Sequence, residues 1–460
     1  MITSPAFAGK RYAVLGLARS GAATVEALLA SQAEVTAWDR QDIAREPFEG
    51  RCRLADPLEL NLSGFAGVVV SPGVPLNTHP IGPHAAQYGV PVIGDIELFA
   101  LARPNLPPHK VVGITGTNGK STTTALVHHI LKTAGVPSLM GGNIGLPILA
   151  QDPLPEGGVY VLELSSYQID LTFSLDCDVA VLLNITPDHL DRYDGFKAYS
   201  RSKQRLFEIQ SPENVALIAE NDPEAGEVAH RLEQNFGRRQ YVRRFHPDLG
   251  AENQADWPSL QGPHNAQNAV AAIAICQALG LGQMEVEAGL RTYPGLPHRM
   301  ERLCEHEGVL FVNDSKATNP ESAAPALAAY PPDHGRPRIH WIVGGLPKEE
   351  GLGSCENYLG NIAAAYTVGE AGPHFAELLE GRVPRLERCE LVSEAVSRAH
   401  AAAQPGDVVL LSPACASFDQ FRDYEKRGEH FRQMVGVLTG NPECTRHESA
   451  PSEFAKDLPR

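Results

Sequence analysis

Short apolar runs alternate with longer amphipathic stretches along most of the chain. Y-A-V-L at 12–15 is followed by a glycine turn, by apolar residues at helical spacing and then by a second apolar run, E-V-T-A-W, at 34–38. The same order repeats from K-V-V-G-I-T at 110–115 onwards. Parallel strands need a crossover connection, usually a helix, so this alternation predicts an α/β chain with mostly parallel sheets.

At 460 residues the chain is too long for a single compact core, because such cores stop growing near roughly 250–300 residues. A proline-rich stretch, R-P-N-L-P-P-H-K at 103–110, interrupts the pattern and predicts a linker. A proline-glycine segment before Arg299 marks a second boundary. We therefore predict a Rossmann-like N-terminal domain (1–105), a central domain (106–298), a Rossmann-like C-terminal domain (299–440) and a polar, frayed tail (441–460).

The chain is acidic, with a formal net charge of −16. Nucleic-acid binding without sequence preference needs a broad basic surface, so we expect no nucleic-acid partner. Anionic ligands would have to be held by local groups such as backbone N–H groups, a lysine or a divalent cation. Nowhere do about 18 apolar residues follow one another. The first residues also lack a basic segment followed by an apolar one, so we expect a cytoplasmic protein with no membrane contact.

Eight cysteines are scattered through the chain, and no two stand at the spacing of a zinc or redox motif. This distribution favours reduced, mostly buried thiols. The cysteines are Cys52, Cys177, Cys276, Cys304, Cys355, Cys389, Cys415 and Cys444.

The glycine turn after the first strand is typical of a nucleotide-binding domain, but it is incomplete. Gly16 follows the strand, and Ala18 occupies the position at which a second glycine would let the backbone approach a pyrophosphate. Asp39, after the next strand, could receive a ribose or a base. An NAD site, a site for another nucleotide and a purely structural turn all stay open. A later strand of this unit ends in S-P-G at 71–73.

The strongest signal is G-I-T-G-T-N-G-K-S-T at 113–122, between an apolar strand and an amphipathic helix. Glycines let successive N–H groups turn inward around phosphate oxygens, and the helix N-terminus adds positive potential. Lys120 supplies a point charge, and the Ser121 hydroxyl can reach Mg²⁺. Such a loop grips the terminal phosphates, so we predict a central P-loop ATPase domain that transfers the γ-phosphoryl group and releases ADP. The candidate ATP ligands here are Gly116, Thr117, Asn118, Gly119, Lys120, Ser121 and Thr122.

Two strands of the central unit end in side chains that suit a metal ion. V-Y-V-L-E ends at Glu163, whose carboxylate would project at the carboxyl edge of the sheet. N-I-T-P-D-H-L-D follows another strand and brings His189 to the same edge. Glu163 either binds Mg²⁺ or only caps the next helix. His189 either ligates a second cation or is a structural hydrogen-bonding group.

Other candidates in this region are less specific. Asn265 and Asn268 stand one helical turn apart, so they share a face that could meet a nucleotide. His298 and Arg299 follow a proline-glycine hinge, where domain closure could be regulated. Lys203 lies on a predicted helix, where a solvated lysine is the default interpretation.

Two strands of the third unit end in polar clusters. The segments are N-D-S-K-A-T at 313–318, before a helix with an early proline, and S-P-A-C-A-S-F at 412–418, which is expected to open a helix itself. Each cluster is either a binding site or a structural element. The candidate side chains are Asp314, Lys316 and Thr318 in the first segment, and Ser417 and Phe418 in the second.

Taken together, the motifs resemble those of the Mur ligases, in the family's order over about residues 10–435. The phosphate loop begins one position early, at Gly113. This longer loop also resembles that of folylpolyglutamate synthases. The last two motifs and S-P-G resemble the D-glutamate-adding members. The motifs are G-I-T-G-T-N-G-K-S-T, G-G-N-I-G at 141–145, L-E-L-S-S-Y-Q, N-I-T-P-D-H-L-D-R-Y, H-N-x-x-N, G-L-P-H-R, N-D-S-K-A-T-N and L-L-S-P-A-C-A-S-F-D-Q-F.

The resemblance implies an ADP-forming ligase of peptidoglycan precursor synthesis, with a UDP-binding first domain that would explain the missing second glycine. It would join D-glutamate to UDP-N-acetylmuramoyl-L-alanine through an acyl phosphate, as a monomer, with ATP and two Mg²⁺ ions. A carbamylated Lys203 would help to fix the second ion. The candidates are Lys120, Ser121, Glu163, His189 and Lys203 for catalysis and metal; Asn265, Asn268, Arg299, Asp314 and Lys316 for ATP; and Gly16, Asp39, Arg40, Ser71, Pro72, Gly73, Asn143, His298, Thr318, Lys348, Ser417, Phe418 and Tyr424 for the two substrates.

Two positions depart from the family's pattern. G-G-L-P-K-E-E places a proline before Lys348 and acids after it, and Tyr424 stands where phenylalanine is commoner. The rival hypotheses are a sibling Mur ligase that adds another amino acid, a ligase like folylpolyglutamate synthase, and a non-catalytic nucleotide-binding regulator. A dinucleotide oxidoreductase is disfavoured by Ala18.

Overall fold

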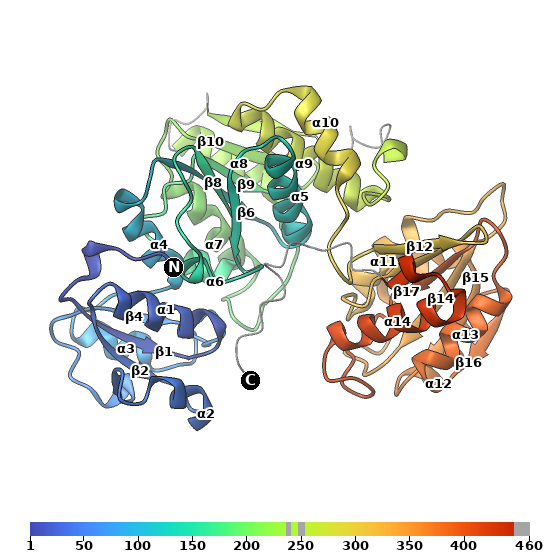
Figure 1. The fold of residues 1–460 in the computed structure, drawn as a ribbon, viewed down its shortest axis with the longest axis horizontal. Helices are drawn as coiled ribbons and strands as arrows, with labels where there is room; N and C mark the ends of the chain where they lie inside the picture. Colours follow the sequence, from blue (N-terminus) through green and yellow to red (C-terminus); the bar gives the residue numbers. More distant parts are fainter. Residues whose placement is uncertain (236–240, 247–253, 446–460) are drawn as a thin grey trace. The chain divides into compact units, whose positions relative to one another are not determined.

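The computed structural model describes residues 1–235, 241–246 and 254–445, which form three sheets with helices packed on their faces (Figure 1). One sheet falls in each predicted domain, and the predicted α/β class is confirmed. The chain divides into two compact units, which are described separately below. Unit 1 comprises Met1–Pro247 and Asn268–Leu290, and unit 2 comprises Asp248–Gln267 and Arg291–Arg460.

The first sheet of unit 1 is parallel throughout, in the order β3-β2-β1-β4-β5. Its first turn needs glycine twice: Gly16 has a φ of +88°, and a Cβ on Gly21 would lie 1.8 Å from the Gly16 carbonyl oxygen. The elements are β1 (Arg11–Leu15), α1 (Arg19–Ala30), β2 (Glu34–Trp38), α2 (Asp42–Arg45), β3 (Arg53–Leu54), β4 (Phe65–Val70), α3 (Ile81–Gln87), β5 (Val92–Ile93) and α4 (Asp95–Ala102).

The second sheet of unit 1 is also parallel, in the order β11-β10-β9-β6-β8-β7. Strands β8 and β9 are buried along their whole length, so their sequences are nearly continuous apolar runs. The elements are β6 (His109–Thr115), α5 (Lys120–Thr133), β7 (Ser138–Gly142), β8 (Gly158–Glu163), α6 (Ser166–Asp170), β9 (Val179–Leu182), α7 (Phe196–Glu208), β10 (Val215–Ala219), α8 (Pro223–Asn235), β11 (Val242–Phe245), α9 (Pro263–Leu279) and α10 (Gln283–Thr292).

Helix α4 joins the two sheets of unit 1. Its apolar side chains, among them Phe99, belong to the same buried cluster as Tyr160 of β8. The buried Glu97 carboxylate accepts hydrogen bonds from the Phe173 and Ser174 amides (2.6 and 2.9 Å) and from the Ser174 hydroxyl (2.7 Å). Because a buried carboxylate is stable only when it is well bonded, this contact fixes the first sheet against the second.

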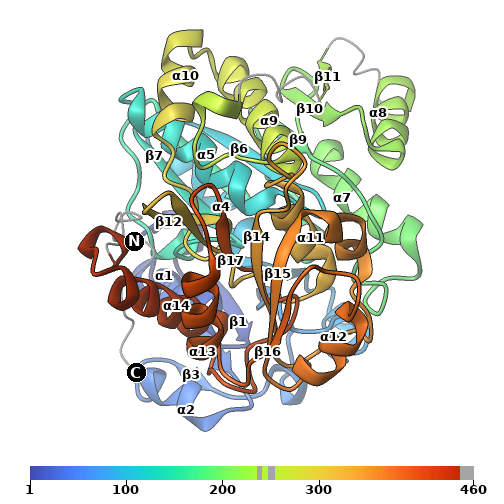
Figure 2. The ribbon, with the colours of Figure 1, turned by 90° about the vertical axis from the view of Figure 1, so that its right-hand side faces the viewer.

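The third sheet lies in unit 2, in the order β12-β13-β17-β14-β15-β16. Figure 2 shows α11 and α12 on one face of this sheet and α13 and α14 on the other. The two strands expected to end in polar clusters are β13 and β17, but the antiparallel edge strand β12 was not expected from the sequence. The elements are β12 (Glu301–His306), β13 (Val309–Asn313), α11 (Pro320–Ala328), β14 (Ile339–Gly344), β15 (Ile362–Val368), α12 (Gly372–Leu379), β16 (Leu386–Arg388), α13 (Val392–Ala402), β17 (Val408–Leu411) and α14 (Tyr424–Thr439).

Three local predictions were wrong. The linker at 103–110 is shorter than expected, because residues 103–105 form a 3-10 turn and His109 already belongs to β6. The tail was expected to fray from residue 441, but Pro442–Thr445 form a 3-10 turn, and residues 446–460 lie outside the described part. Cys304 and Cys444 form a disulfide, so these two thiols are not reduced.

The other six cysteines are unpaired within the described residues, and all but the half-buried Cys52 are buried, as expected. Among the described helices, none is both long enough and apolar enough to cross a membrane.

Candidate functional site

The predicted phosphate loop lies between β6 and α5, at the carboxyl edge of the second sheet. Gly119 has a φ of +82°, and a Cβ there would lie 2.4 Å from the Asn268 side-chain oxygen. Glycine is therefore required both by the turn and by the close approach of α9. Helix α5 begins at Lys120, directly after the loop, so its N-terminus provides the positive potential expected for a phosphate site.

Asn184 supports this loop and was not singled out from the sequence. Its side-chain oxygen accepts hydrogen bonds from the amides of Thr117 (3.1 Å) and Asn118 (2.8 Å), and its Nδ2 donates to the Asn118 carbonyl oxygen at 3.2 Å. The sequence signal for Asn184 was its position as the first residue of N-I-T-P, two residues after the end of β9. These bonds turn the amides of Thr117 and Asn118, two of the predicted ATP ligands, toward Asn184.

Two lysines converge on the loop. The ammonium groups of Lys120 and Lys203 each lie 2.9 Å from the Gly116 carbonyl oxygen, and Lys120 also donates to the Thr117 carbonyl at 2.8 Å. Lys203 is only 1% exposed, so the default interpretation of a solvated lysine was wrong. Burial and then the charge of Lys120 hold the pKa of Lys203 well below its usual value. Tertiary contact between α7 and the loop thus lowers the pKa of this amine.

Glu163 ends β8 as predicted and lies beside the loop, because Ile114 is its register partner on β6. The residue is 2% exposed, and its Oε1 accepts a hydrogen bond from Asn143 Nδ2 at 3.0 Å. The Asn143 amide donates to the Glu163 carbonyl at 2.9 Å. A Cβ on Gly142 would lie 2.1 Å from that same carbonyl oxygen, so the G-G-N-I-G motif lets β7 approach Glu163 closely.

The other carboxylate oxygen of Glu163, Oε2, is buried without a hydrogen-bond partner among the described residues. An unpaired anionic oxygen in a buried position is costly, and a bound cation would compensate for it. No group of three or more His, Cys, Asp and Glu residues in the described part is close enough to hold a metal by itself. A single carboxylate such as that of Glu163 fits Mg²⁺, because this ion takes one or two carboxylates and completes its shell with water and phosphate oxygens.

The remaining candidates around the loop differ in their surroundings. Asn268 is buried on α9 and accepts a hydrogen bond from Thr123 Oγ1 at 3.3 Å, whereas Asn265 donates to the Gln261 carbonyl at 3.1 Å. His189 is half exposed and has a φ of +52°. Its Nε2 lies 3.5 Å from an oxygen of Asp188.

The carboxyl edge of the first sheet brings together the residues predicted to hold a nucleotide. The Asp39 carboxylate accepts hydrogen bonds from the Leu17 amide at 2.7 Å and the Gln41 amide at 2.9 Å, so it shapes the turn that follows Gly16. The Ser71 hydroxyl donates to the Gly16 carbonyl at 2.9 Å. Arg40 is exposed beside this turn.

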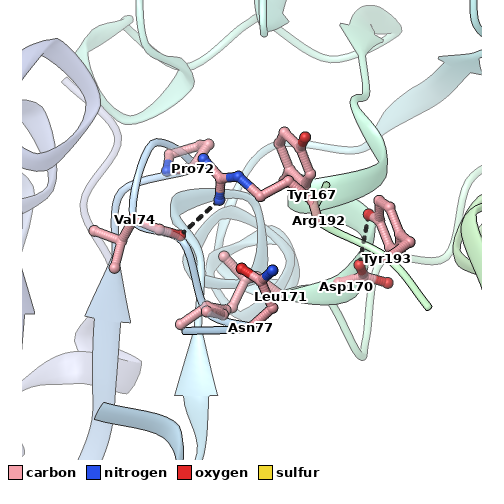
Figure 3. A pocket seen from close by; sticks show the side chains of 9 residues that line it. Pro72, Val74, Asn77, Tyr167, Asp170, Leu171, Arg192 and Tyr193 are labelled. Atoms are coloured by element: carbon pink, nitrogen blue, oxygen red, sulfur yellow. Dashed lines mark hydrogen bonds between the residues drawn. The ribbon is translucent and has the colours of Figure 1, made fainter. Parts of the chain in front are cut away.

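A cavity of about 270 Å³ opens between the loop after β4 and the segments around α6 (Figure 3). Pro72 and Val74 line it on one side. Arg192, on the other side, donates to the Gly73 and Val74 carbonyls at 3.3 and 3.4 Å. Lining residues that the sequence did not single out are Val74, Leu76, Asn77, Tyr167, Asp170, Leu171, Arg192 and Tyr193; three of them stand inside the quoted motifs S-S-Y-Q and D-H-L-D-R-Y.

In unit 2, Asp314 lies at the carboxyl end of β13 as predicted. Its carboxylate accepts hydrogen bonds from the Ser412 hydroxyl at 2.7 Å and the Met300 amide at 3.1 Å. Burial raises the pKa of Asp314 to about 7, so this carboxyl titrates near neutral pH.

The structure also brings together the predicted amino-acid ligands of unit 2. The Lys348 ammonium donates to the Thr318 hydroxyl at 3.1 Å, despite the proline that precedes the lysine. Lys316 lies 3.8 Å from the centre of the Tyr424 ring. Ser417 is buried and Phe418 is 68% exposed. The sequence predicted that these two residues open a helix. This prediction was wrong, because α14 begins only at Tyr424.

Arg427, which the sequence did not flag, holds the two polar clusters of unit 2 together. It is 2% exposed and donates to the carbonyl and hydroxyl of Ser315 (2.9 and 3.0 Å) and to the carbonyls of Cys415 (3.0 Å) and Ala416 (3.1 Å). It therefore fixes the segments that carry Thr318 and Ser417.

His298 is more deeply placed than a substrate ligand in a hinge would suggest. It is 5% exposed, and its Nδ1 lies 3.0 Å from Asn313 Nδ2. Its backbone amide donates to Glu301 at 3.0 Å. His298 and Met300 both have positive φ values (62° and 48°), so Arg299 stands in an unusually bent segment.

Comparison with known proteins agrees with this geometry. Residues 114–276 match the Mur ligase middle domain, and residues 298–415 match the Mur ligase glutamate ligase domain. A UDP-N-acetylmuramoylalanine–D-glutamate ligase of Novosphingobium aromaticivorans is 60% identical over 98% of this chain and its own full length. The chain belongs to the Mur ligase family, in its UDP-N-acetylmuramoylalanine–D-glutamate ligase branch.

As a Mur ligase, the chain is an ATP-dependent, amide-forming enzyme, which confirms the predicted class. The Rhizobium meliloti ligase of the same name is 43% identical over 96% of this chain and 99% of its own length. The solved MurC, UDP-N-acetylmuramate–alanine ligase, of Thermotoga maritima shares the fold with a TM-score of 0.57 and 15% identity, over 93% of this chain and 99% of that one.

Proposed function

We propose that this Mur ligase joins D-glutamate to UDP-N-acetylmuramoyl-L-alanine in the cytoplasm and converts ATP to ADP and phosphate. The observation that carries the chemistry is the convergence of Lys120 and Lys203 on the Gly116 carbonyl, beside the buried Glu163. The choice of substrates rests on the names of relatives up to 60% identical over almost the whole chain.

The first step of the proposed reaction is attack of the alanyl carboxylate on the γ-phosphate of ATP. Both reactants are anionic, so their approach requires compensating positive charge. Lys120 and the N-terminus of α5 provide it on the protein side. Glu163, Ser121, His189 and a carbamylated Lys203 would hold Mg²⁺, which supplies further charge neutralisation when bound. The products of this step are an acyl phosphate and ADP.

The second step is attack of the D-glutamate amine on the acyl phosphate, with phosphate as the leaving group. Thr318, Lys348, Ser417 and Phe418 would hold D-glutamate. The Lys348–Thr318 pair presents an ammonium group and a hydroxyl together, which suits a carboxylate. Asp314, Lys316 and Arg299 would contact ATP from unit 2. Exclusion of water is needed here, because an acyl phosphate hydrolyses readily.

The nucleotide-sugar would bind along the first sheet of unit 1. Gly16, Asp39 and Arg40 would hold the UDP part, and Ser71–Gly73 with Asn143 would hold the muramoyl part. Pro72 also lines the cavity described above, whose arginine and tyrosines suit a polar sugar.

Lys203 is expected to carry a carbamate. Carbamylation joins a neutral amine to CO₂ and releases one proton, and the lowered pKa of the buried Lys203 favours the neutral amine. Removal of CO₂ from the buffers should therefore lower turnover reversibly. Because protonation of the amine opposes the reaction, the modified fraction should fall as the pH is lowered. Nuclear magnetic resonance with carbon-13-labelled bicarbonate would measure the carbamate directly.

The matched variants for this test are Lys203→Arg and Lys197→Arg. The first should lose the labelled signal, and the second should keep it, because Lys197 lies on the same helix with 66% of its side chain exposed. A labelled signal that survives Lys203→Arg would contradict the assignment.

A panel of amino acids, assayed for ADP release with ATP and the UDP-sugar dipeptide precursor, tests the proposed function. D-Glutamate should give the highest kcat/KM. A preference for another amino acid would indicate a sibling ligase, and absence of ADP release with every acceptor would indicate a non-catalytic regulator. AMP as the product would contradict the acyl-phosphate route.

A further inference from the structure

Two cysteines far apart in the sequence meet in unit 2. Cys304 lies in the edge strand β12, and Cys444 lies in the 3-10 turn that follows α14. They are 140 residues apart and form a disulfide, with their Cα atoms 5.0 Å apart. Neither residue stands in any motif of the proposed reaction.

The disulfide connects elements that share a second link. Glu301, at the start of β12, forms an ion pair with Arg432 of α14. Cys444 is fully buried in a cluster with Phe311 and Phe431, and Cys304 packs against that cluster. As an edge strand, β12 has a hydrogen-bonded neighbour on one side, β13, within the described sheet. The ion pair, the apolar contacts and the disulfide therefore all help to attach β12 to α14 and the turn that follows it.

We propose that Cys304 and Cys444 form a reversible redox site, which links β12 covalently to the turn after α14 when oxidised and leaves the two held only by the ion pair and the apolar contacts when reduced. The reversibility of the disulfide rests on the proposed function, which places the enzyme in the cytoplasm. Thiols are largely kept reduced in that compartment. A disulfide in that compartment would respond to the ratio of small-molecule disulfide to thiol.

The burial of the two cysteine residues sets the order of the exchange. Cys304 is half buried, whereas Cys444 is fully buried. The Cys304 thiolate attacks a low-molecular-weight disulfide such as oxidised glutathione, forming a mixed disulfide and releasing one glutathione thiolate. The Cys444 thiolate then attacks the Cys304 sulfur and releases the second. Two protein thiols are oxidised, and one glutathione disulfide is reduced to two glutathione molecules, which take up the two protons.

The test is to equilibrate the full-length protein in glutathione buffers of different ratio, label the free thiols and map disulfide peptides by mass spectrometry. Oxidation should remove two labelled thiols and yield a peptide that joins residues 304 and 444. The oxidised protein should melt about 5 °C or more above the reduced one, because the bond closes a long loop in the unfolded chain. Cys444→Ala should retain glutathione on Cys304, whereas Cys304→Ala should retain little on the buried Cys444.

Cys389→Ala is the matched control, because Cys389 is a buried, unpaired cysteine of the same cluster. It should leave the redox dependence of melting unchanged. The proposal is overturned if both thiols stay labelled in every buffer, if another pair forms, or if Cys304→Ala keeps the same redox-dependent shift. These readouts do not involve ligation, so a failed ligase assay would leave them interpretable.

Discussion

Replacing Lys120 with alanine is expected to lower kcat at least about a thousandfold, or roughly 4 kcal/mol of transition-state stabilisation. The Lys120 ammonium lies 2.9 Å from the Gly116 carbonyl at the mouth of the phosphate loop. From there it would neutralise the γ-phosphoryl group as a second anion attacks it. Steady-state ADP release with saturating substrates measures the effect, and a thermal melt establishes that the variant is folded.

Lys132→Ala is the matched control for this prediction. Lys132 stands in the last turn of the same helix and is exposed, so its loss removes a charge from α5 without touching the loop. The control should keep nearly normal turnover. Near-normal turnover of Lys120→Ala itself would refute the assigned role.

Replacing Glu163 with glutamine is expected to lower kcat/KM about a hundredfold, or about 3 kcal/mol, and to raise the Mg²⁺ concentration needed for half-maximal activity. Glutamine keeps an oxygen that can accept the hydrogen bond of Asn143 at 3.0 Å. It removes the negative charge from the buried Oε2, which has no other partner among the described residues. The substitution therefore separates metal binding from the fit of the side chain.

A magnesium titration of ADP release distinguishes the two interpretations of Glu163. If the residue only shapes the strand end, the variant should keep the Mg²⁺ dependence of the parent, and the metal assignment would be wrong. Glu156→Gln is the control, because Glu156 is exposed in the turn before the same strand. Its titration should match that of the parent.

The α/β class and the phosphate loop could be predicted because both depend on local pattern. Continuous apolar runs identify buried parallel strands, and glycines at 116 and 119 adopt positive φ values that other residues rarely take. Glu163 could be placed at a strand end for the same reason. Its unpaired oxygen and its bond to Asn143 could not, since they depend on the register of β7 against β8.

The errors have a common cause in contacts between distant segments. Lys203 has nothing unusual around it in the sequence, and it becomes a buried amine only because α7 packs against the loop at Gly116. Arg427 stands on an ordinary helix, yet it bonds both to Cys415, 12 residues before it, and to Ser315, 112 residues before it. The edge strand β12 lacks a clear apolar run because its residues are mostly half buried.

The sequence by itself determined the α/β order, the position of the phosphate loop and the family, because these depend on residue periodicity and on short motifs. Only the tertiary structure decided which side chains share a microenvironment: Lys203 beside Lys120, Lys348 beside Thr318, and Cys304 bonded to Cys444. The physical reason is that burial, charge proximity and disulfide pairing depend on distances between segments, which spacing along the chain does not encode.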